Sequence, residues 1–305
     1  MKIVPNLYFI GGMRCGSTTL NLLLSQHPEI FMSPVKEPMY WRAEMLRANG
    51  ETDTSGATRR YAEPEAYEGL FDGVTTERWI GESSHYIYAQ GTAELIHAAS
   101  PDARIIVSLR NPAERLFSEF MRGVRAGHFE GEFESFLRRN ATFADDGRIV
   151  DFTPESRIGK GQQARLVKPW IEAFGADHVH FVLFEDLEDH AARTTVEIYR
   201  WLGVDDSFVP VAVHTQRSGV PRSRWLMKSL TTRKGPLKAV RRFLPRILRE
   251  QVRSFVYSKT LERKELPPHL DLALRRFYEP DIVELERLTG RNLESWKVRA
   301  LEAAA

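Results

Sequence analysis

The residues best suited to chemistry stand near the beginning of the printed sequence, in residues 9–20, which read Phe-Ile-Gly-Gly-Met-Arg-Cys-Gly-Ser-Thr-Thr-Leu. The apolar residues 7–10 predict a strand, and the leucine-rich residues of about 18–25 predict a helix. A glycine-rich turn between a strand and a helix is typical of a phosphate cradle, because glycines let the backbone approach and the free N–H groups at the helix start attract an anion. This loop is therefore predicted to bind a phosphate group.

The loop departs from the one that binds nucleoside triphosphates. Within residues 11–18, Ser17 takes the place of the lysine that a Walker A loop directs at the β- and γ-phosphates. The cation of this loop is Arg14 instead. The strand predicted over 104–109 also lacks the aspartate that would hold magnesium in such proteins. Both departures favour a phosphate-containing donor other than ATP.

A second group of polar residues follows the strand predicted over 104–109. Arg110 stands at its carboxyl end, where open α/β sheets bind ligands. Asn111 is a good N-cap for a helix predicted over 112–126. Ser118 on that helix is placed to hold the same phosphate as Arg110. We therefore predict a second phosphate site at this point.

Other arginines of this helix have a simpler explanation. Arg115 and Arg122 are predicted to form surface ion pairs, such as Arg115 with Glu119 four residues later. Farther along, the basic residues 241–257 are better explained by an amphipathic helix than by nucleic-acid binding.

The composition indicates one soluble α/β domain over residues 1–305, with 42% hydrophobic and 28% charged residues and a net charge of +2. One cysteine excludes an intramolecular disulfide and fits a reducing compartment. The sequence shows no leader and no run of the ~20 apolar residues that a membrane span needs. We therefore expect a cytoplasmic protein; its oligomeric state is not predicted.

The pattern of strands and helices predicts a three-layer α/β fold around a mainly parallel sheet, with a helical C-terminal extension. Strand signals fall at 7–10, 30–32, 79–81, 104–109 and 178–184, and helical periodicity at about 18–25, 90–99, 112–126, 163–174 and 190–202. Short helices are expected within 42–78 and a mobile loop over 141–162. After a core of about 5–210, strand signals stop, and helices are predicted at about 224–230, 237–249 and 268–289.

Several short motifs, in their order and spacing, resemble those of sulfotransferases that use 3′-phosphoadenosine 5′-phosphosulfate (PAPS). The resemblance is to the bacterial and carbohydrate-type branch, which includes heparan sulfate sulfotransferase domains. It is carried by residues 10–20, 25–29, 36–38, 81–83, 109–118 and 184–187, and extends over about 5–225 and more weakly 288–296. It implies a P-loop-like fold, PAPS as donor, adenosine 3′,5′-bisphosphate (PAP) as product and no metal requirement.

The resemblance also implies which residues bind the donor. The first loop would hold the 5′-phosphosulfate through Arg14, Cys15, Gly16, Ser17, Thr18 and Thr19. Arg110 and Ser118 would bind the 3′-phosphate, and Arg217 and Arg222 would belong to a basic segment over the nucleotide. For these last two a solvated turn is the alternative. Cys15 is interpreted as a small residue that fits the loop rather than as a reactive thiol.

Sulfuryl transfer to a hydroxyl, or as second choice an amine, needs a base on the acceptor side and a cation on the leaving phosphate. The resemblance assigns the base to Glu37, and Arg14 is the predicted cation. His85 is the second candidate for the base, since histidine titrates near neutrality. Glu37, His85, Tyr40, Trp41 and Glu82 are predicted to bind the acceptor. Without the resemblance, Glu37 would be interpreted as a surface partner of Lys36.

The acceptor is predicted only as a class: a small molecule, a sugar or a biosynthetic intermediate. Met39 and Ser83 stand where carbohydrate-type members often have histidine and lysine, and Arg14 stands where many relatives have lysine. The first two departures weaken the case for a heparan-like acceptor. Two other classes remain as alternatives: a P-loop kinase that uses ATP and magnesium on a small metabolite, and a nucleotide-binding protein without catalysis.

Overall fold

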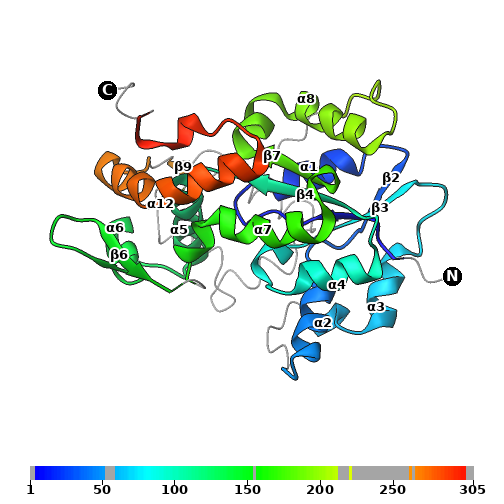
Figure 1. The fold of residues 1–305 in the computed structure, drawn as a ribbon, viewed down its shortest axis with the longest axis horizontal. Helices are drawn as coiled ribbons and strands as arrows, with labels where there is room; N and C mark the ends of the chain where they lie inside the picture. Colours follow the sequence, from blue (N-terminus) through cyan, green and yellow to red (C-terminus); the bar gives the residue numbers. More distant parts are fainter. Residues whose placement is uncertain are drawn as a thin grey trace, which may run out of the picture.

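The computed structural model describes residues 4–51, 59–153, 156–211, 220–221, 261–262 and 265–299. Its centre is a five-stranded sheet with the order β2-β3-β1-β4-β7, in which all paired neighbours are parallel (Figure 1). The strands are β1 (Leu7–Phe9), β2 (Ile30–Met32), β3 (Trp79–Ser83), β4 (Arg104–Leu109) and β7 (Val179–Leu183). The predicted parallel sheet is confirmed. Because β1 lies between β3 and β4, the loop after β1 opens where the strand order reverses, which is where such sheets bind ligands.

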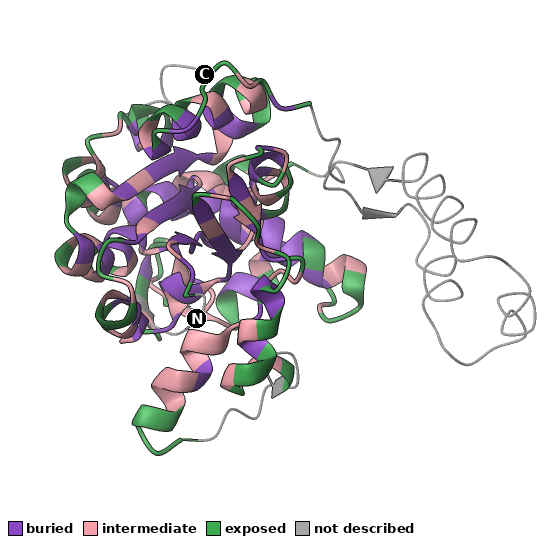
Figure 2. Ribbon diagram, turned by 90° about the vertical axis from the view of Figure 1, so that its right-hand side faces the viewer, coloured by how far each residue is buried: buried purple, intermediate pink, exposed green. Residues whose placement is uncertain are grey.

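Both faces of the sheet are covered, which explains the continuous apolar runs in the strands. Residues 105–109 of β4 are all buried, and the strands form the buried centre of the molecule (Figure 2). One face packs against α4 (Thr92–Ala99), α5 (Pro112–Ala126), α7 (Gln163–Phe174) and α12 (Pro268–Thr289). The other face packs against α1 (Ser17–Leu24) and α8 (Phe184–Leu202). The three layers are therefore helices, sheet and helices.

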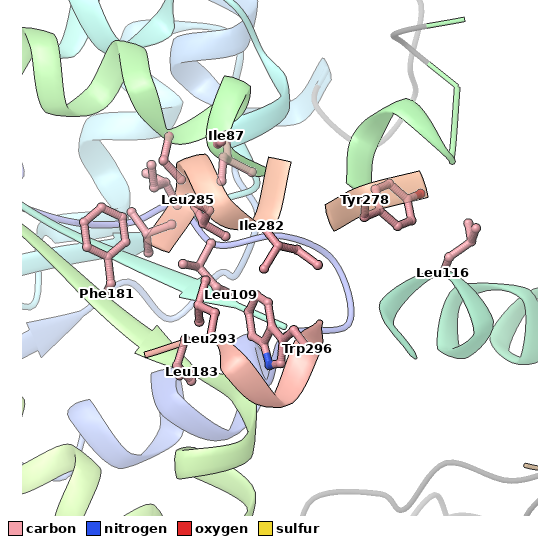
Figure 3. Packing of buried hydrophobic residues seen from close by; sticks show 14 of the residues in the cluster. Ile87, Leu109, Leu116, Phe181, Leu183, Tyr278, Ile282, Leu285, Leu293 and Trp296 are labelled. Atoms are coloured by element: carbon pink, nitrogen blue, oxygen red, sulfur yellow. The ribbon is translucent and has the colours of Figure 1, made fainter. Parts of the chain in front are cut away.

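The C-terminal helix α12 is part of the main core. Tyr278, Ile282 and Leu285 of this helix belong to one buried cluster with Leu109 of β4 and Phe181 of β7 (Figure 3). Its bounds agree with the helix predicted over 268–289. The helices predicted at 224–230 and 237–249 lie outside the described residues.

The segment 141–162 is not the predicted loop. It contains an antiparallel hairpin of β5 (Ala141–Phe143) and β6 (Ile149–Phe152), followed by the short 3-10 helix η4 (Gly159–Gly161). Ile149 is buried in the main core, and Phe143 and Phe152 pack against it. This packing stabilises the two strands. The acids and glycines of the segment had indicated a loop, so the prediction was wrong.

The prediction that strands stop at residue 211 was also wrong. A short antiparallel pair joins β8 (Val220–Pro221) to β9 (Leu261–Glu262). Two-residue strands so far apart in the sequence leave no local pattern. The expected short helices of residues 42–78 are present as α2 (Tyr40–Ala48), η1 (Arg59–Tyr61), α3 (Pro64–Glu68) and η2 (Gly69–Phe71). The other described elements are η3 (Tyr86–Tyr88), α6 (Phe133–Arg138), η5 (Ala176–His178) and η6 (Glu294–Trp296).

Arg115 forms the predicted ion pair with Glu119, but the pair is buried instead of lying on the surface. Its Nη1 lies 2.9 Å from Glu119 Oε2, and the Arg115 side chain is 1% exposed. Arg157 also pairs with Glu119, and Arg115 Nη2 donates to the Arg157 carbonyl over 2.7 Å. A buried arginine with these partners serves the packing of α5 and is not available to a ligand.

Candidate functional site

The loop between β1 and α1 requires glycine at two places. Gly16 has φ +79°, and a Cβ there would lie 2.6 Å from Leu187. A Cβ on Gly11 would lie 2.0 Å from Ser108 Oγ. No described side chain caps the start of α1, and a helix start of this kind attracts an anion. Ser17 is buried at this helix start, followed by Thr18 and Thr19 in the first turn.

The structure brings Arg14, Arg110 and Ser118 together. Arg14 Nε donates to Ser118 Oγ over 3.0 Å, and Arg110 Nη1 donates to the Arg14 carbonyl over 3.3 Å. Asn111 caps α5 as predicted, because its side chain accepts from the N–H of Ala113 over 3.0 Å. The two predicted cradles therefore meet: the arginine of the first loop lies against the serine of the second.

The Arg110 guanidinium is held on two sides. It stacks on the ring of Phe184, with 4.1 Å from Cζ to the ring centroid, and its Nη2 lies 3.1 Å from Glu114 Oε2. Neither contact was predicted from the sequence. Glu114 stands four residues after Arg110, a spacing that favours such a pair, whereas Phe184 reaches the site only through the pairing of β7 with β4.

The electrostatics of this part of the site favour an anion. The pKa of Arg14 is lowered to about 10, first by burial and then by the positive charges of Arg125, Arg110 and Arg122. Because like charges disfavour the protonated guanidinium, a bound phosphate would stabilise the group. This arrangement fits the phosphate groups that the sequence predicts here.

The second part of the site joins Lys36, Glu37 and His85. Lys36 Nζ donates to Ser17 Oγ over 2.9 Å and lies 3.2 Å from Glu37 Oε1. His85 Nε2 lies 3.0 Å from the same carboxylate oxygen, and His85 Nδ1 lies 2.7 Å from the Gly11 carbonyl oxygen. The two candidate bases are therefore in direct contact, and a lysine links them to the start of α1.

These contacts keep the Glu37 carboxylate ionised. The pKa of Glu37 is lowered to about 2, first by its hydrogen bond with His85, and Lys36 contributes in the same direction. The Gly11 carbonyl accepts hydrogen bonds, and so does an ionised Glu37. Both ring nitrogens of His85 therefore face oxygen atoms that can accept a hydrogen bond.

Backbone strain coincides with the same site. Among the described residues, those other than glycine with positive φ are Arg14, Glu37 and Met39, with φ of 74°, 61° and 58°. A left-handed conformation costs such residues of order 1–3 kcal/mol and clusters at functional sites. Two of these three residues, Arg14 and Glu37, are the predicted cation and base. This coincidence supports a functional role for the two loops that contain them.

The thiol of Cys15 is not reactive in this structure. The side chain is 1% exposed, and burial raises its pKa to about 12. The neutral thiol fills space below the loop, in agreement with the interpretation of Cys15 as a small residue that fits.

The remaining acceptor-side candidates lie beside buried aromatic residues. Tyr40 stacks on Tyr67 with ring centroids 4.2 Å apart, and the backbone N–H of Trp41 donates to the Tyr86 hydroxyl over 3.2 Å. Glu82 is 0% exposed. Neither of its carboxyl oxygens has a hydrogen-bond partner among the described residues. Binding of the acceptor by Tyr40, Trp41 and Glu82 therefore stays a prediction.

Burial also raises the pKa of Glu82 to about 8, against the effect of the nearby Tyr86 and Tyr67 hydroxyls. Between pH 4.5, its ordinary pKa, and about 8, the unfolded state releases a proton that the folded state keeps. Stability should therefore fall with rising pH in this window, by roughly 1.4 kcal/mol per pH unit from this residue. Glu82→Gln, which stays neutral, should remove this slope in urea denaturation at pH 5 and pH 8, whereas Glu94→Gln on an exposed position should not. An unchanged slope in Glu82→Gln would show that the buried carboxyl is ionised.

Two predicted residues, Arg217 and Arg222, lie outside the described residues. Lys36 is the functional candidate that sequence reasoning missed, because it appeared there only as a surface partner of Glu37. Its contact with Ser17 depends on the position of the β2 end beside α1. Among the described residues, no three histidine, cysteine, aspartate or glutamate side chains gather as a metal site, and none of the described helices is long and apolar enough to cross a membrane.

A cavity of about 480 Å³ lies elsewhere, between α6, the β5–β6 hairpin and α12, and is lined by Arg138, Phe143, Arg148, Arg276 and Phe277 among others. It shares no residue with the site described above.

Comparison with known proteins shows the family to which the chain is similar. A family model described as "Sulfotransferase family" matches residues 5–208. Carbohydrate sulfotransferase 15 of Homo sapiens is 25% identical over 249 residues, which cover 66% of this chain and 43% of that protein. Bifunctional heparan sulfate N-deacetylase/N-sulfotransferase 1 of Caenorhabditis briggsae is 20% identical over 218 residues, which cover 67% of this chain and 23% of that protein. The chain thus spans less than half the length of these relatives.

Among solved structures, a sulfotransferase from Alicyclobacillus acidocaldarius matches with a TM-score of 0.68 and 26% identity, over 96% of this chain and 99% of that one. The match extends well beyond residues 5–208 and therefore includes the part of the chain that contains α12.

Proposed function

Because the chain belongs to the family of PAPS-dependent sulfotransferases, we propose that it transfers a sulfuryl group to a hydroxyl of a carbohydrate or small-molecule acceptor. The observation that carries this proposal is the position of Lys36. Its ammonium lies 2.9 Å from Ser17 Oγ at the start of α1 and 3.2 Å from Glu37 Oε1. One lysine therefore adjoins both the phosphate cradle and the proposed base.

PAPS supplies the sulfuryl group when bound, and the residues present fit it. The N–H groups at the start of α1 and Ser17 bind the 5′ end. Arg110 and Ser118 bind the 3′-phosphate, and Arg14, which contacts both of these residues, neutralises negative charge between the two ends. Lys36 joins Arg14 as the cation that stabilises the leaving phosphate. The sequence had assigned this role to Arg14 alone, and we add Lys36 to it.

Glu37 accepts the proton of the acceptor hydroxyl. Its carboxylate is ionised in the resting protein, since its pKa is about 2. His85 holds the carboxylate in place through Nε2 while the Gly11 carbonyl fixes its Nδ1 side. If Glu37 turns away, a neutral His85 with its proton on Nδ1 presents a bare Nε2 to the same space, which keeps His85 as the second candidate for the base.

A sugar hydroxyl is the acceptor that the named relatives favour, and Tyr40 and Trp41 on α2, which begins three residues after Glu37, offer aromatic surface for it. Neither residue is fully buried. An amine acceptor is the second choice, since one relative is named an N-sulfotransferase.

The experiment combines binding with transfer. Calorimetry with PAP and with ATP plus magnesium is paired with a sulfuryl-transfer assay on a panel of sugar and small-molecule hydroxyls. Binding of PAP, no binding of ATP and transfer to one class of acceptor would support the proposal. Magnesium-dependent ATP binding would favour a kinase, and PAP binding without transfer to any acceptor would favour a nucleotide-binding protein without catalysis.

Loss of the Arg110 guanidinium tests the 3′-phosphate assignment. Arg110→Ala is expected to raise the Kd for PAP by about 10- to 150-fold, because hydrogen bonds to charged groups contribute about 1.5–3 kcal/mol. The Kd for 5′-AMP, which lacks the 3′-phosphate, should change little. Calorimetry with both nucleotides measures the difference, with Arg138→Ala as an exposed control. Equal losses for both nucleotides would contradict the assignment.

A further inference from the structure

The backbone of Arg110 is held by the side-chain amide of Gln163. Gln163 Nε2 donates to the Arg110 carbonyl over 2.8 Å, and the Arg110 N–H donates to Gln163 Oε1 over 3.3 Å. Gln163 is 4% exposed, so these hydrogen bonds are partly shielded from water. Both polar groups of one backbone residue thus find partners in one amide.

The hydrogen bonds between Gln163 and Arg110 begin where the strand pairing of β4 ends. The pairing of β4 with β7 ends at Leu109 and Leu183, and Arg110 is the next residue. The Gln163 amide takes the place that a neighbouring strand would have at Arg110. It therefore fixes the point at which the guanidinium leaves the sheet edge.

Gln163 is itself held by the C-terminal helix. It is the first residue of α7, and the preceding residue, Gln162, makes no side-chain cap to this helix. Asp281 of α12 supplies that function, because its Oδ2 accepts from the Ala164 N–H over 3.2 Å. Burial raises the pKa of the Asp281 carboxyl to about 6, and hydrogen bonds from the backbone N–H groups of Ala164, Gln163 and Arg165 act in the opposite direction. Asp281 thus caps α7 from another part of the chain.

The tip of Arg110 is held separately. Phe184 and Glu114 contact the guanidinium, whereas Gln163 contacts the backbone. Loss of Gln163 would leave the partly buried N–H and carbonyl of Arg110 without these partners, and a movement of the backbone would relieve this cost. Such a movement displaces the guanidinium although every contact at its tip is still available.

We propose that Gln163 is a positioning residue for donor binding, which holds Arg110 in register with the 3′-phosphate. The inference rests on the proposed function, since it needs Arg110 to bind that phosphate. Gln163 itself does not touch the nucleotide, and its effect is confined to ligands that carry a 3′-phosphate.

The test measures the Kd of Gln163→Leu for PAP and for 5′-AMP by calorimetry. We expect the Kd for PAP to rise by about 5- to 50-fold, in the range of one or two lost hydrogen bonds to a buried group, and the Kd for 5′-AMP to stay unchanged. In the Arg110→Ala background, Gln163→Leu should have no further effect on PAP binding. Gln162→Leu, on the adjacent glutamine, is the matched control and should keep the affinity of the wild type.

A purely structural role would give a different pattern, in which both nucleotides lose affinity equally or the two changes add. Either result, or an unchanged Kd for PAP, would overturn the positioning role. Gln163→Met, which removes the same hydrogen bonds with a flexible apolar side chain, replaces the leucine variant if that one does not fold. A wild type without preference for PAP over 5′-AMP would overturn the proposed function together with the positioning role. A preference that Arg110→Ala abolishes and Gln163→Leu retains would overturn the positioning role alone.

Discussion

Glu37→Gln is expected to lower kcat by about 10²–10⁴-fold, the range in which removal of a general base falls. The amide keeps the shape of the side chain but no longer accepts the proton of the acceptor. Affinity for PAP should remain close to that of the wild type, because the proposed role of Glu37 is toward the acceptor and not toward the nucleotide. Steady-state transfer kinetics together with calorimetric PAP binding measure the two effects separately.

Glu51→Gln is the matched control, since Glu51 follows α2 at an exposed position. It should leave both kcat and PAP affinity unchanged. Turnover of Glu37→Gln within a few-fold of the wild type would reject Glu37 as the base, and a strong loss in His85→Ala at the same time would transfer the role to His85.

The pH profile of activity tests whether His85 lowers the pKa of Glu37. Because the lowered pKa of Glu37 is about 2, the carboxylate stays ionised throughout the range in which the protein is handled, and its activity is lost only as the pH falls toward that value. The hydrogen bond from His85 is the first cause of the shift. His85→Ala should therefore move the acidic limb of the kcat/KM profile upward, toward the ordinary pKa of a glutamate, 4.5. A limb that stays in place would show that the contact does not control Glu37.

Lys36→Met is expected to lower kcat by about 10²–10³-fold, as does the loss of one group that stabilises developing charge. The methionine side chain keeps the apolar stem but removes the ammonium that lies between Ser17 and Glu37. The effect should appear in kcat more than in KM, because charge on the leaving phosphate develops only in the transition state.

Lys168→Met is the control for this change. Lys168 is 59% exposed on α7 and lies 3.8 Å from Glu172, a surface pair from which little is expected. A second variant, Lys36→Arg, keeps the charge while changing its geometry, and partial recovery of kcat would assign the effect to charge. A Lys36→Met variant with the kcat of the wild type would leave Arg14 as the sole candidate for the cation.

Strain and charge act together at the two loops. The left-handed conformations of Arg14 and Glu37 direct their side chains toward Ser118 and His85, each of which comes from a different strand–helix unit. The surrounding contacts maintain conformations that the isolated loops would rarely adopt. This explains why one site brings together residues of the first loop, the β2 end, the β3 end and α5.

The sequence alone determined the features that depend on near neighbours in the chain. The glycine-rich loop and its helix, the cap at Asn111 and the bounds of α5, α7 and α12 agree with the structure. Helical periodicity, capping and turn chemistry act over a few residues, so they can be recognised without knowledge of the fold. The hairpin at 141–152 was missed because its strands depend on distant packing partners.

Only the tertiary structure decided which charged groups meet. Arg14 contacts Ser118 across 104 residues and His85 contacts Gly11 across 74. Gln163 reaches the backbone of Arg110 across 53. The parallel sheet order places the ends of β1, β3 and β4 side by side, and no local pattern encodes that order. Motif order could therefore name candidate site residues, whereas the contacts between them, including those of Lys36 and Gln163, follow from how the strands are arranged.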